Sequence, residues 1–258
     1  MTALQNYDQY IDRCVNGYYK RTHFCADFVT ATSSQLYTNQ RLSFQIANIA
    51  TIGSLPAGVA GLRITNATLH ITTVLPVTLG KLVFLGSYNY GTGVFSTGNA
   101  MPTETEGNVS RVSSSAIVAY ALTQLVLSSG VVSTTVQYTD QDGNMGAAAP
   151  AFTFVTGAVA GSAGLLPLAA GDVGAQDITN VTVAGGGSAT GTIGFFGFIP
   201  FGNFGNESRV TATPSQLNFI TDTPTPPLVN VGDQLGLLIY NNGAKRVQGT
   251  ISFVGEQP

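Results

Sequence analysis

Apolar and polar residues alternate along most of this chain with the period of two that is typical of half-buried β-strands. The clearest run is Leu62–Val74, and Lys81–Tyr90 follows it across Pro76 and Gly80. Leu42–Ile46 alternates in the same way. The pattern predicts strands over all three segments and indicates a hairpin-like arrangement of the first two.

Two short segments carry turn signals between alternating runs. Asn242-Gly243 separates Gln234–Tyr240 from Arg246–Val254, and Asn-Gly between two such runs predicts a tight hairpin. Asp140–Asn144 contains Asp142-Gly143 and also resembles the first half of a calcium loop. The glycine and the final glutamate that such a loop needs are not at their positions, so we favour a hairpin turn here.

The chain contains a weak internal repeat at a shift of about 98 to 115 residues, counted directly from the sequence. The matched segments keep their order, which predicts a duplicated β unit. They are Leu55-Pro56 with Leu166-Pro167, Ile64–Leu69 with Ile178–Val183, Phe84–Gly86 with Phe195–Gly197, Asn108–Ser113 with Asn206–Thr211, and Thr135–Tyr138 with Thr250–Phe253.

The best helix candidate is Thr2–Tyr19, which opens with a capping-box pattern and has apolar residues at three- and four-residue spacing. The aromatic segment Tyr18–Phe28 follows it. Two interpretations stay open: an amphipathic helix packed on the β fold, or an arm that docks on a neighbouring subunit.

These elements predict an all-β protein with two tandem β-sandwich or jelly-roll-like units and a short N-terminal helix. We expect an N-terminal helical arm over residues 1–34, a first β unit over 35–147 and a second over 148–258. Ala147–Ala170, rich in Ala and Gly, forms the passage between the units. A chain of 258 residues is long enough for two such cores.

Charged residues make up only 9% of the chain, and the formal net charge is −3. Such a bare surface favours a protein covered by partner subunits, or a Thr/Ser/Asn/Gly surface like those of virion proteins. Ten scattered Lys and Arg residues form no basic stripe, which argues against nucleic-acid binding. The first residues resemble no signal peptide and no apolar run is long enough for a membrane span, so we expect synthesis in a host cytoplasm.

Catalytic and metal-binding chemistry has little support. The two histidines are His23 and His70, and the two cysteines are Cys14 and Cys25. No fourth ligand lies at zinc-site spacing, so we expect no metal and no cofactor. Two unmodified thiols and a disulfide both stay open. Neither a nucleophile–base pair nor paired carboxylates can be nominated, and we expect no enzyme.

Several segments resemble structural proteins of tailed-bacteriophage virions. They are the turn Tyr138–Asn144, the segment Val94–Thr103 and the Leu-Pro to Gly-Asp run that ends at Asp172, all within Gly91–Asp177. The resemblance lies in the Thr/Ser/Ala/Gly-rich texture. It implies a β-sandwich or jelly roll on the capsid surface, often a trimer, which cements neighbouring capsomers and has no catalytic residues.

We therefore expect a capsid decoration or cement protein, a homo-oligomer with capsid or other virion proteins as partners and no nucleic-acid or membrane partner. The alternatives are a shell-forming double jelly-roll protein and a carbohydrate-binding or adhesive module. Aromatic residues beside glycines, beside the Gly91–Gly107 loop and in the N-terminal arm are the candidate contact anchors, with a core position as the alternative for each. They are Tyr7, Tyr18, Tyr19, Phe24, Tyr88, Tyr90, Phe201 and Phe204.

Overall fold

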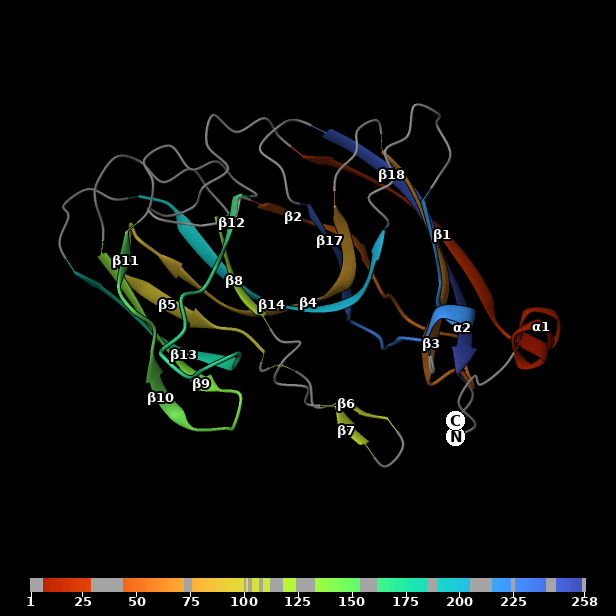
Figure 1. The fold of residues 1–258 in the computed structure, drawn as a ribbon, viewed down its shortest axis with the longest axis horizontal. Coiled ribbons are helices and arrows are strands. Elements are labelled where there is room, and N and C mark those ends of the chain that lie inside the picture. The colour runs from red at the N-terminus through yellow and green to blue at the C-terminus, as the bar shows by residue number, and fades with distance from the viewer. Residues whose placement is uncertain are drawn as a thin grey trace.

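The computed structural model describes residues 7–28, 44–71, 76–99, 101, 104–106, 109–111, 118–123, 133–153, 162–184, 190–204, 215–223, 226–239 and 245–256. These residues form an all-β fold with two short helices (Figure 1), which confirms the predicted fold class. In chain order the elements are α1 (Tyr7–Asn16), β1 (Tyr19–Phe28), β2 (Phe44–Thr51), β3 (Gly61–Ile71), β4 (Val77–Asn89), β5 (Val94–Thr97), β6 (Glu104–Glu106), β7 (Val109–Arg111), β8 (Val118–Thr123), β9 (Ser133–Asp140), β10 (Met145–Ala148), β11 (Phe152–Thr153), β12 (Ser162–Leu165), β13 (Ala175–Ala184), β14 (Thr192–Phe204), β15 (Ser215–Asn218), α2 (Phe219–Asp222), β16 (Leu228–Val229), β17 (Gln234–Ile239) and β18 (Lys245–Glu256).

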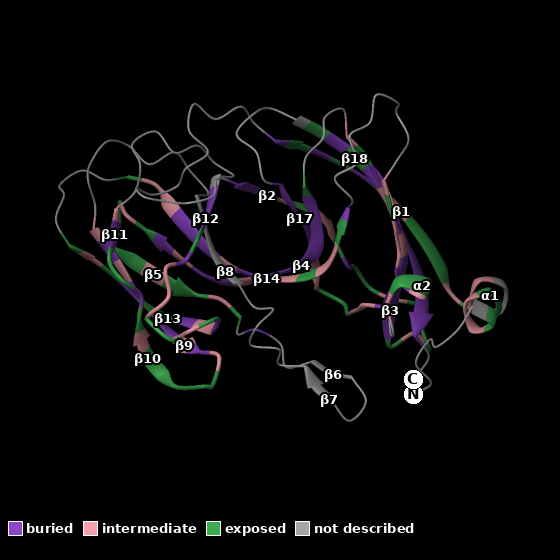
Figure 2. Ribbon diagram, in the orientation of Figure 1, coloured by how far each residue is buried: buried purple, intermediate pink, exposed green. Residues whose placement is uncertain are grey.

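Six strands close into a central ring in the order β4, β17, β2, β12, β8 and β14, because β14 pairs with both β8 and β4. β5 pairs with the end of β4 outside the ring. Among the ring strands, β4 and β17 are largely buried (Figure 2). One cluster of buried side chains comes only from these strands and fills the interior: Phe44, Ile46, Leu82, Ala163, Phe198 and Leu238.

Two glycines leave room for that interior packing. Gly80 on β4 pairs with Gly236 on β17. A Cβ atom on Gly80 would lie 2.5 Å from the Phe198 ring, and one on Gly236 would lie 2.5 Å from Leu82. Any larger residue would displace these core side chains, so both positions require glycine.

Two outer sheets pack on the ring. Sheet I has the order β1, β18, β3 and β15, with β16 also beside β3, and sheet II consists of β9 with β10 and β11 on one side and β13 on the other. In the cluster under sheet I, Val77 and Leu79 of β4 pack with residues of sheet I such as Leu62. In the cluster under sheet II, Val83 and Leu85 of β4 pack with residues of sheet II.

The predicted repeat is confirmed by the strand register. The β3–β18 pair and the β13–β9 pair align the matched residues in the same way, and both have a bulge at the matched position, Thr65 or Thr179. The β13–β9 pair has a second irregularity between Ala175 and Asp177. The corresponding partners are Thr68–Thr250 with Thr182–Thr135, Ala67–Ile251 with Val181–Val136, Asn66–Ser252 with Asn180–Gln137, and Ile64–Phe253 with Ile178–Tyr138. At the first bulge the Thr65 hydroxyl donates to the Ser252 carbonyl over 3.2 Å.

The same pairing shows that the two repeats are intertwined. β9 belongs to the first repeat but pairs with β13 of the second, and β18 of the second pairs with β3 of the first. In the ring, β17 joins β2 and β4, while β8 joins β12 and β14. The late strands of each repeat thus pair with the early strands of the other, as a two-fold exchange requires. The two expected β units, 35–147 and 148–258, therefore both contribute strands to the ring and to both outer sheets. The expected boundary between them falls within β10.

Two predicted hairpins, β3–β4 and β17–β18, are wrong. β17 and β18 lie in the ring and in sheet I respectively, although Asn242-Gly243 stands between them. β3 and β4 are separated in the same way. β3, β17 and β18 have both edges occupied by partners far away in sequence, and β14 and β17 occupy the two edges of β4 over Val77–Leu82. Tertiary pairing therefore outweighs the local turn signal. The turn residues 240–244 lie outside the described residues.

The N-terminal segment also differs from the prediction. α1 lies within the expected helix, and residues 1–6 lie outside the described part of the chain. Tyr18–Phe28 is not an arm, because β1 pairs with β18 along its whole length. Its even-numbered residues Phe24, Ala26 and Phe28 are buried under sheet I. The Gly91–Gly107 loop contains β5 and β6. Neither described helix has the length and apolar character needed to cross a bilayer.

The exchange of strands predicts that neither half folds alone. We expect fragments 1–157 and 158–258 to be unstructured separately and to form the native fold when they are co-expressed, because each sheet takes strands from both fragments. Circular dichroism and amide NMR spectra of each fragment and of the purified complex would measure this. A single fragment with a dispersed, cooperative fold would contradict the exchanged pairing.

Candidate functional site

The most distinct surface feature in the described part of the chain is an open groove of about 670 Å³ on the outer face of sheet I. Three adjacent strands form it, since β18 lies between β1 and β3. Its lining residues are Arg21, His23, Phe24, Cys25, Thr68, His70, Gln248, Gly249 and Thr250. Strand alternation places the odd-numbered residues of β1 on this face and the even-numbered ones in the core.

The register arranges the groove in rows across the strands. Cys25, Gln248 and His70 form one row, and His23, Thr250 and Thr68 form the next. The two threonine hydroxyls lie 2.7 Å apart, and the Arg21 guanidinium donates to Thr250 over 3.3 Å. The groove therefore presents hydrogen-bonding groups and one permanent positive charge.

Both histidines of the chain line this groove together with Cys25. Metal binding requires three or more ligands within a few ångströms of one point. The described residues contain no group of three His, Cys, Asp or Glu side chains arranged in that way. Cys25 and Cys14 are free thiols, on β1 and α1 respectively. The hydrogen-bonding side chains that line the groove suit a polar contact with another molecule.

One side of the groove ends at an exposed ion pair. The Asp27 carboxylate accepts from Arg246 Nε over 2.7 Å and from Arg246 Nη2 over 3.1 Å. These hydrogen bonds to Arg246 lower the pKa of Asp27 below its usual value. This carboxylate beside the groove is thus already engaged by a guanidinium.

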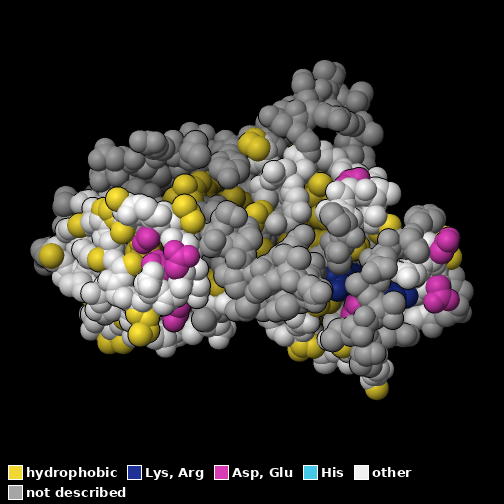
Figure 3. Space-filling view, turned by 60° about the horizontal axis from the view of Figure 1, so that its bottom comes forward, with side chains coloured by type: hydrophobic (Ala, Val, Ile, Leu, Met, Phe, Trp, Pro, Cys, Tyr) yellow, Lys and Arg dark blue, Asp and Glu magenta, His cyan; other side chains and the backbone are white. Residues whose placement is uncertain are grey.

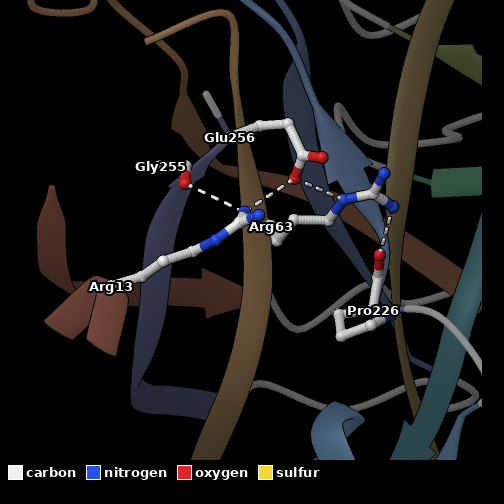
Figure 4. Close-up of polar contacts among 5 residues, drawn as sticks. All are labelled: Arg13, Arg63, Pro226, Gly255 and Glu256. Carbon is white, nitrogen blue, oxygen red and sulfur yellow. Dashed lines mark hydrogen bonds and ion pairs between the residues drawn. The ribbon is translucent and has the colours of Figure 1, made fainter. Parts of the chain in front are cut away.

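A buried ion network lies at the other end of sheet I (Figure 4). Glu256 at the end of β18 is 1% exposed, and its Oε2 atom accepts from Arg63 Nε over 3.0 Å and from Arg13 Nη1 over 3.2 Å. Arg63 also donates to the Pro226 carbonyl over 2.8 Å. Arg13 also donates to the Gly255 carbonyl over 3.2 Å, so that this network attaches α1 to the sheet. Glu256 Oε1 has no hydrogen-bond partner among the described residues.

At the far end of the molecule, the β9–β10 turn and the loop before β13 form a second distinct feature, here called the acidic tip (residues 140–145 and 169–175). The Asp140 carboxylate accepts from the backbone NH groups of Asp142 and Asn144 over 2.8 and 2.9 Å and from Asn144 Nδ2 over 2.8 Å. The hydrogen bond from the Asn144 side chain makes the largest contribution to lowering the pKa of Asp140. Gly143 has a φ angle of 87°, which suits glycine. The predicted hairpin turn is confirmed.

Further hydrogen bonds hold the loop against this turn. Tyr138 donates to Asp172, and its hydroxyl accepts from Ala169 NH over 2.8 Å. Burial, together with the bond to Asp172, raises the pKa of Tyr138 to about 12. Gln141 Oε1 accepts from Val173 NH over 3.1 Å, and the Gln141 carbonyl accepts from Gln176 Nε2 over 2.9 Å. The acidic tip is therefore a cross-linked unit.

The structure places most of the candidate contact aromatics in the core, the alternative that their sequence positions left open. Phe24, Tyr88 and Phe204 are between 3% and 9% exposed. Tyr18 and Phe201 pack against the cluster under sheet I, and Tyr90 packs against the cluster under sheet II. Tyr88 and Tyr90 meet edge to face with ring centroids 5.0 Å apart. The Tyr7 side chain lies outside the described residues.

Tyr19 keeps an exposed position. It is 43% exposed, and its hydroxyl donates to Ser252 over 3.2 Å. Its role as a contact anchor stays a prediction. Sequence reasoning missed the groove, although the spacing of Arg21, His23 and Cys25 already places them on one face of a strand. That β18 and β3 would bring Gln248 and His70 beside them has no local signal.

Comparisons with known proteins add little. No family model and no curated protein matches the chain. Among solved structures, the VP2 subviral particle of infectious bursal disease virus aligns with a TM-score of 0.22 and 8% identity, over 93% of this chain and 81% of that one. The T=1 particle derived from the same virus aligns with a TM-score of 0.23 and 9% identity, over 93% and 78%. At such TM-scores the likeness carries no argument about this chain.

The buried network predicts a large effect of a near-isosteric change. In Glu256→Gln, Arg63 keeps its buried charge but loses its carboxylate partner, and we expect the free energy of unfolding to fall by about 3–5 kcal/mol. Urea denaturation measures this. Arg246→Ala, which breaks the exposed pair with Asp27, is the matched control and should change little. Equal losses in both variants would show that burial does not distinguish the two pairs.

The acidic tip predicts a pH dependence. Because the pKa of Asp140 is lowered by folding, its contribution to stability is present above the ordinary carboxyl pKa of about 3.9 and is lost as the pH falls through the lower folded value. The stability difference between wild type and Asp140→Asn should therefore shrink as the pH falls from 5 towards 2. Asp142→Asn, in the same turn, is the control. A difference that does not change with pH would contradict this role.

Proposed function

We propose that this chain is a non-enzymatic virion structural protein, located on the capsid surface, that decorates or cements a bacteriophage capsid through subunit contacts. The resemblance of Gly91–Asp177 to virion proteins suggests the bacteriophage setting. The proposal includes a homo-oligomer, with a trimer favoured, and partners among capsid or other virion proteins.

The observation that carries the proposal is the location of the few charged side chains. Charged residues are 9% of the chain, and several of them are used internally. Lys81 is 3% exposed and lies 2.8 Å from Asp233, in addition to the network of Arg13, Arg63 and Glu256. The outer surface is therefore even poorer in ions than the composition indicates.

Such a surface suits extensive contact with other proteins. Covering a charged side chain removes its hydration, which costs free energy unless a partner charge replaces the water. Interface cores are accordingly depleted of charged residues. Wide Thr-, Ser-, Asn- and Gly-bearing surfaces can be covered by neighbouring subunits without that cost.

One of the two alternatives is favoured by a specific observation. The groove on sheet I favours a carbohydrate-binding or adhesive module, because Arg21, Gln248 and Thr250 offer side-chain hydrogen-bonding groups in one concavity. A shell-forming double jelly-roll protein requires a closed barrel in each half. The strand pairing offers that reading no support, because both halves contribute strands to one ring.

The proposal predicts saturable binding to capsid shells. We expect the purified chain to sediment as an oligomer and to bind empty shells of a candidate phage at a fixed number of copies per shell, measured by gradient sedimentation. Shells already saturated with the untagged protein are the control. Absence of binding, with retention of the monomer on a glycan array, would reject the proposal in favour of the adhesive module.

A further inference from the structure

Sheet II and sheet I differ in the sign of the charges that they carry. The stretch 133–184, which contains sheet II and the acidic tip, has four aspartates and no Lys, Arg, His or Glu. The strands of sheet I carry five Lys or Arg residues, two acidic residues and both histidines. On the face shown in Figure 3, the acidic side chains over sheet II have no Lys or Arg beside them, whereas the other end carries both basic and acidic side chains.

The groove is a concavity within the basic sheet. None of its lining residues is a carboxylate, and they include Arg21 and two imidazoles. The guanidinium of Arg21 supplies a permanent positive charge. Asp27 is paired with Arg246, as described above. The groove therefore favours an occupant with negative charge.

The acidic tip has the properties of such an occupant. Asp142 is exposed at its surface, and Asp172 is half-buried beside it, with its carboxylate accepting from Tyr138. Two apolar side chains lie beside them, Met145 at 82% and Val173 at 57% exposed. Exposed apolar residues next to charges are typical of a contact surface. The hydrogen bonds of Asp140, Tyr138 and Gln141 hold the tip in one conformation, which reduces the entropy lost on docking.

We propose that the acidic tip of one copy docks in the sheet I groove of a second copy, head to tail. Sheets I and II lie at opposite ends of the long axis (Figure 1), so the tip reaches only another molecule's groove. A head-to-tail contact generates a closed ring when the rotation closes and a chain of subunits when it does not. The proposal rests on the homo-oligomer included in the proposed function and names its contact.

A charge-swap experiment tests the contact. Arg21→Glu places a negative charge in the groove, and Asp142→Lys places a positive charge on the tip. Each variant alone should self-associate at least about ten-fold more weakly than wild type, since like charges then face each other. An equimolar mixture of the two should regain association, because each variant groove then meets a tip of opposite charge. Sedimentation velocity over a range of concentrations measures all three.

The controls change the same charges elsewhere. Lys20→Glu lies next to Arg21 on the opposite face of β1, and Asp8→Lys lies on α1; both should associate like wild type. A monomeric wild type, unaffected association in either charge-reversed variant, or a mixture that stays dissociated would overturn the inference. Shell binding by a monomeric Arg21→Glu variant would leave the proposed function standing, whereas self-association without shell binding would reject only that function.

Discussion

The ladder between β4 and β14 is the constraint on which the remaining structure depends. Both strands have 13 residues, and each contributes to the interior of the ring and to both outer clusters. Their pairing closes the ring and at the same time presents Val77 and Leu79 to sheet I and Val83 and Leu85 to sheet II. Because the ladder joins one strand from each repeat, closing the core also joins the repeats.

The exchange of late strands follows from the same ladder. With β4 and β14 paired at the centre, β17 occupies the edge of β4 and β8 occupies the edge of β14, and the following strands β18 and β9 complete the outer sheets. The matching bulges at Thr65 and Thr179 shift the register and increase the local twist at the same position in both outer sheets. A duplicated sequence has thus produced one interlocked body.

Scarcity of charge gives each remaining ion an identifiable place. Buried pairs such as Glu256–Arg63 and Lys81–Asp233 fix the ends of strands within the fold, where a lost partner leaves an uncompensated charge. Of the exposed charges, Arg21 lies in the groove of sheet I and Asp142 lies on the acidic tip. Because charged residues are only 9% of the chain, the rest of the surface offers few ions whose hydration a neighbour would remove, which joins the proposed role in a capsid with the proposed head-to-tail contact.

The sequence by itself determined the local elements. Alternation in Leu62–Val74 and Lys81–Tyr90 predicted β3 and β4, Asp142-Gly143 predicted the turn after β9, and the spaced matches predicted a repeat whose register the structure confirms. Only the tertiary structure decided which strands are neighbours. Asn242-Gly243 failed as a hairpin signal because the edges of β17 and β18 are filled by strands far away in sequence. Phe24, Tyr88 and Phe204 could belong to a core or to an interface, since burial depends on what packs above a residue. His23 and His70 lie in one groove because β18 pairs with both β1 and β3, and this pairing is likewise a property of the tertiary structure.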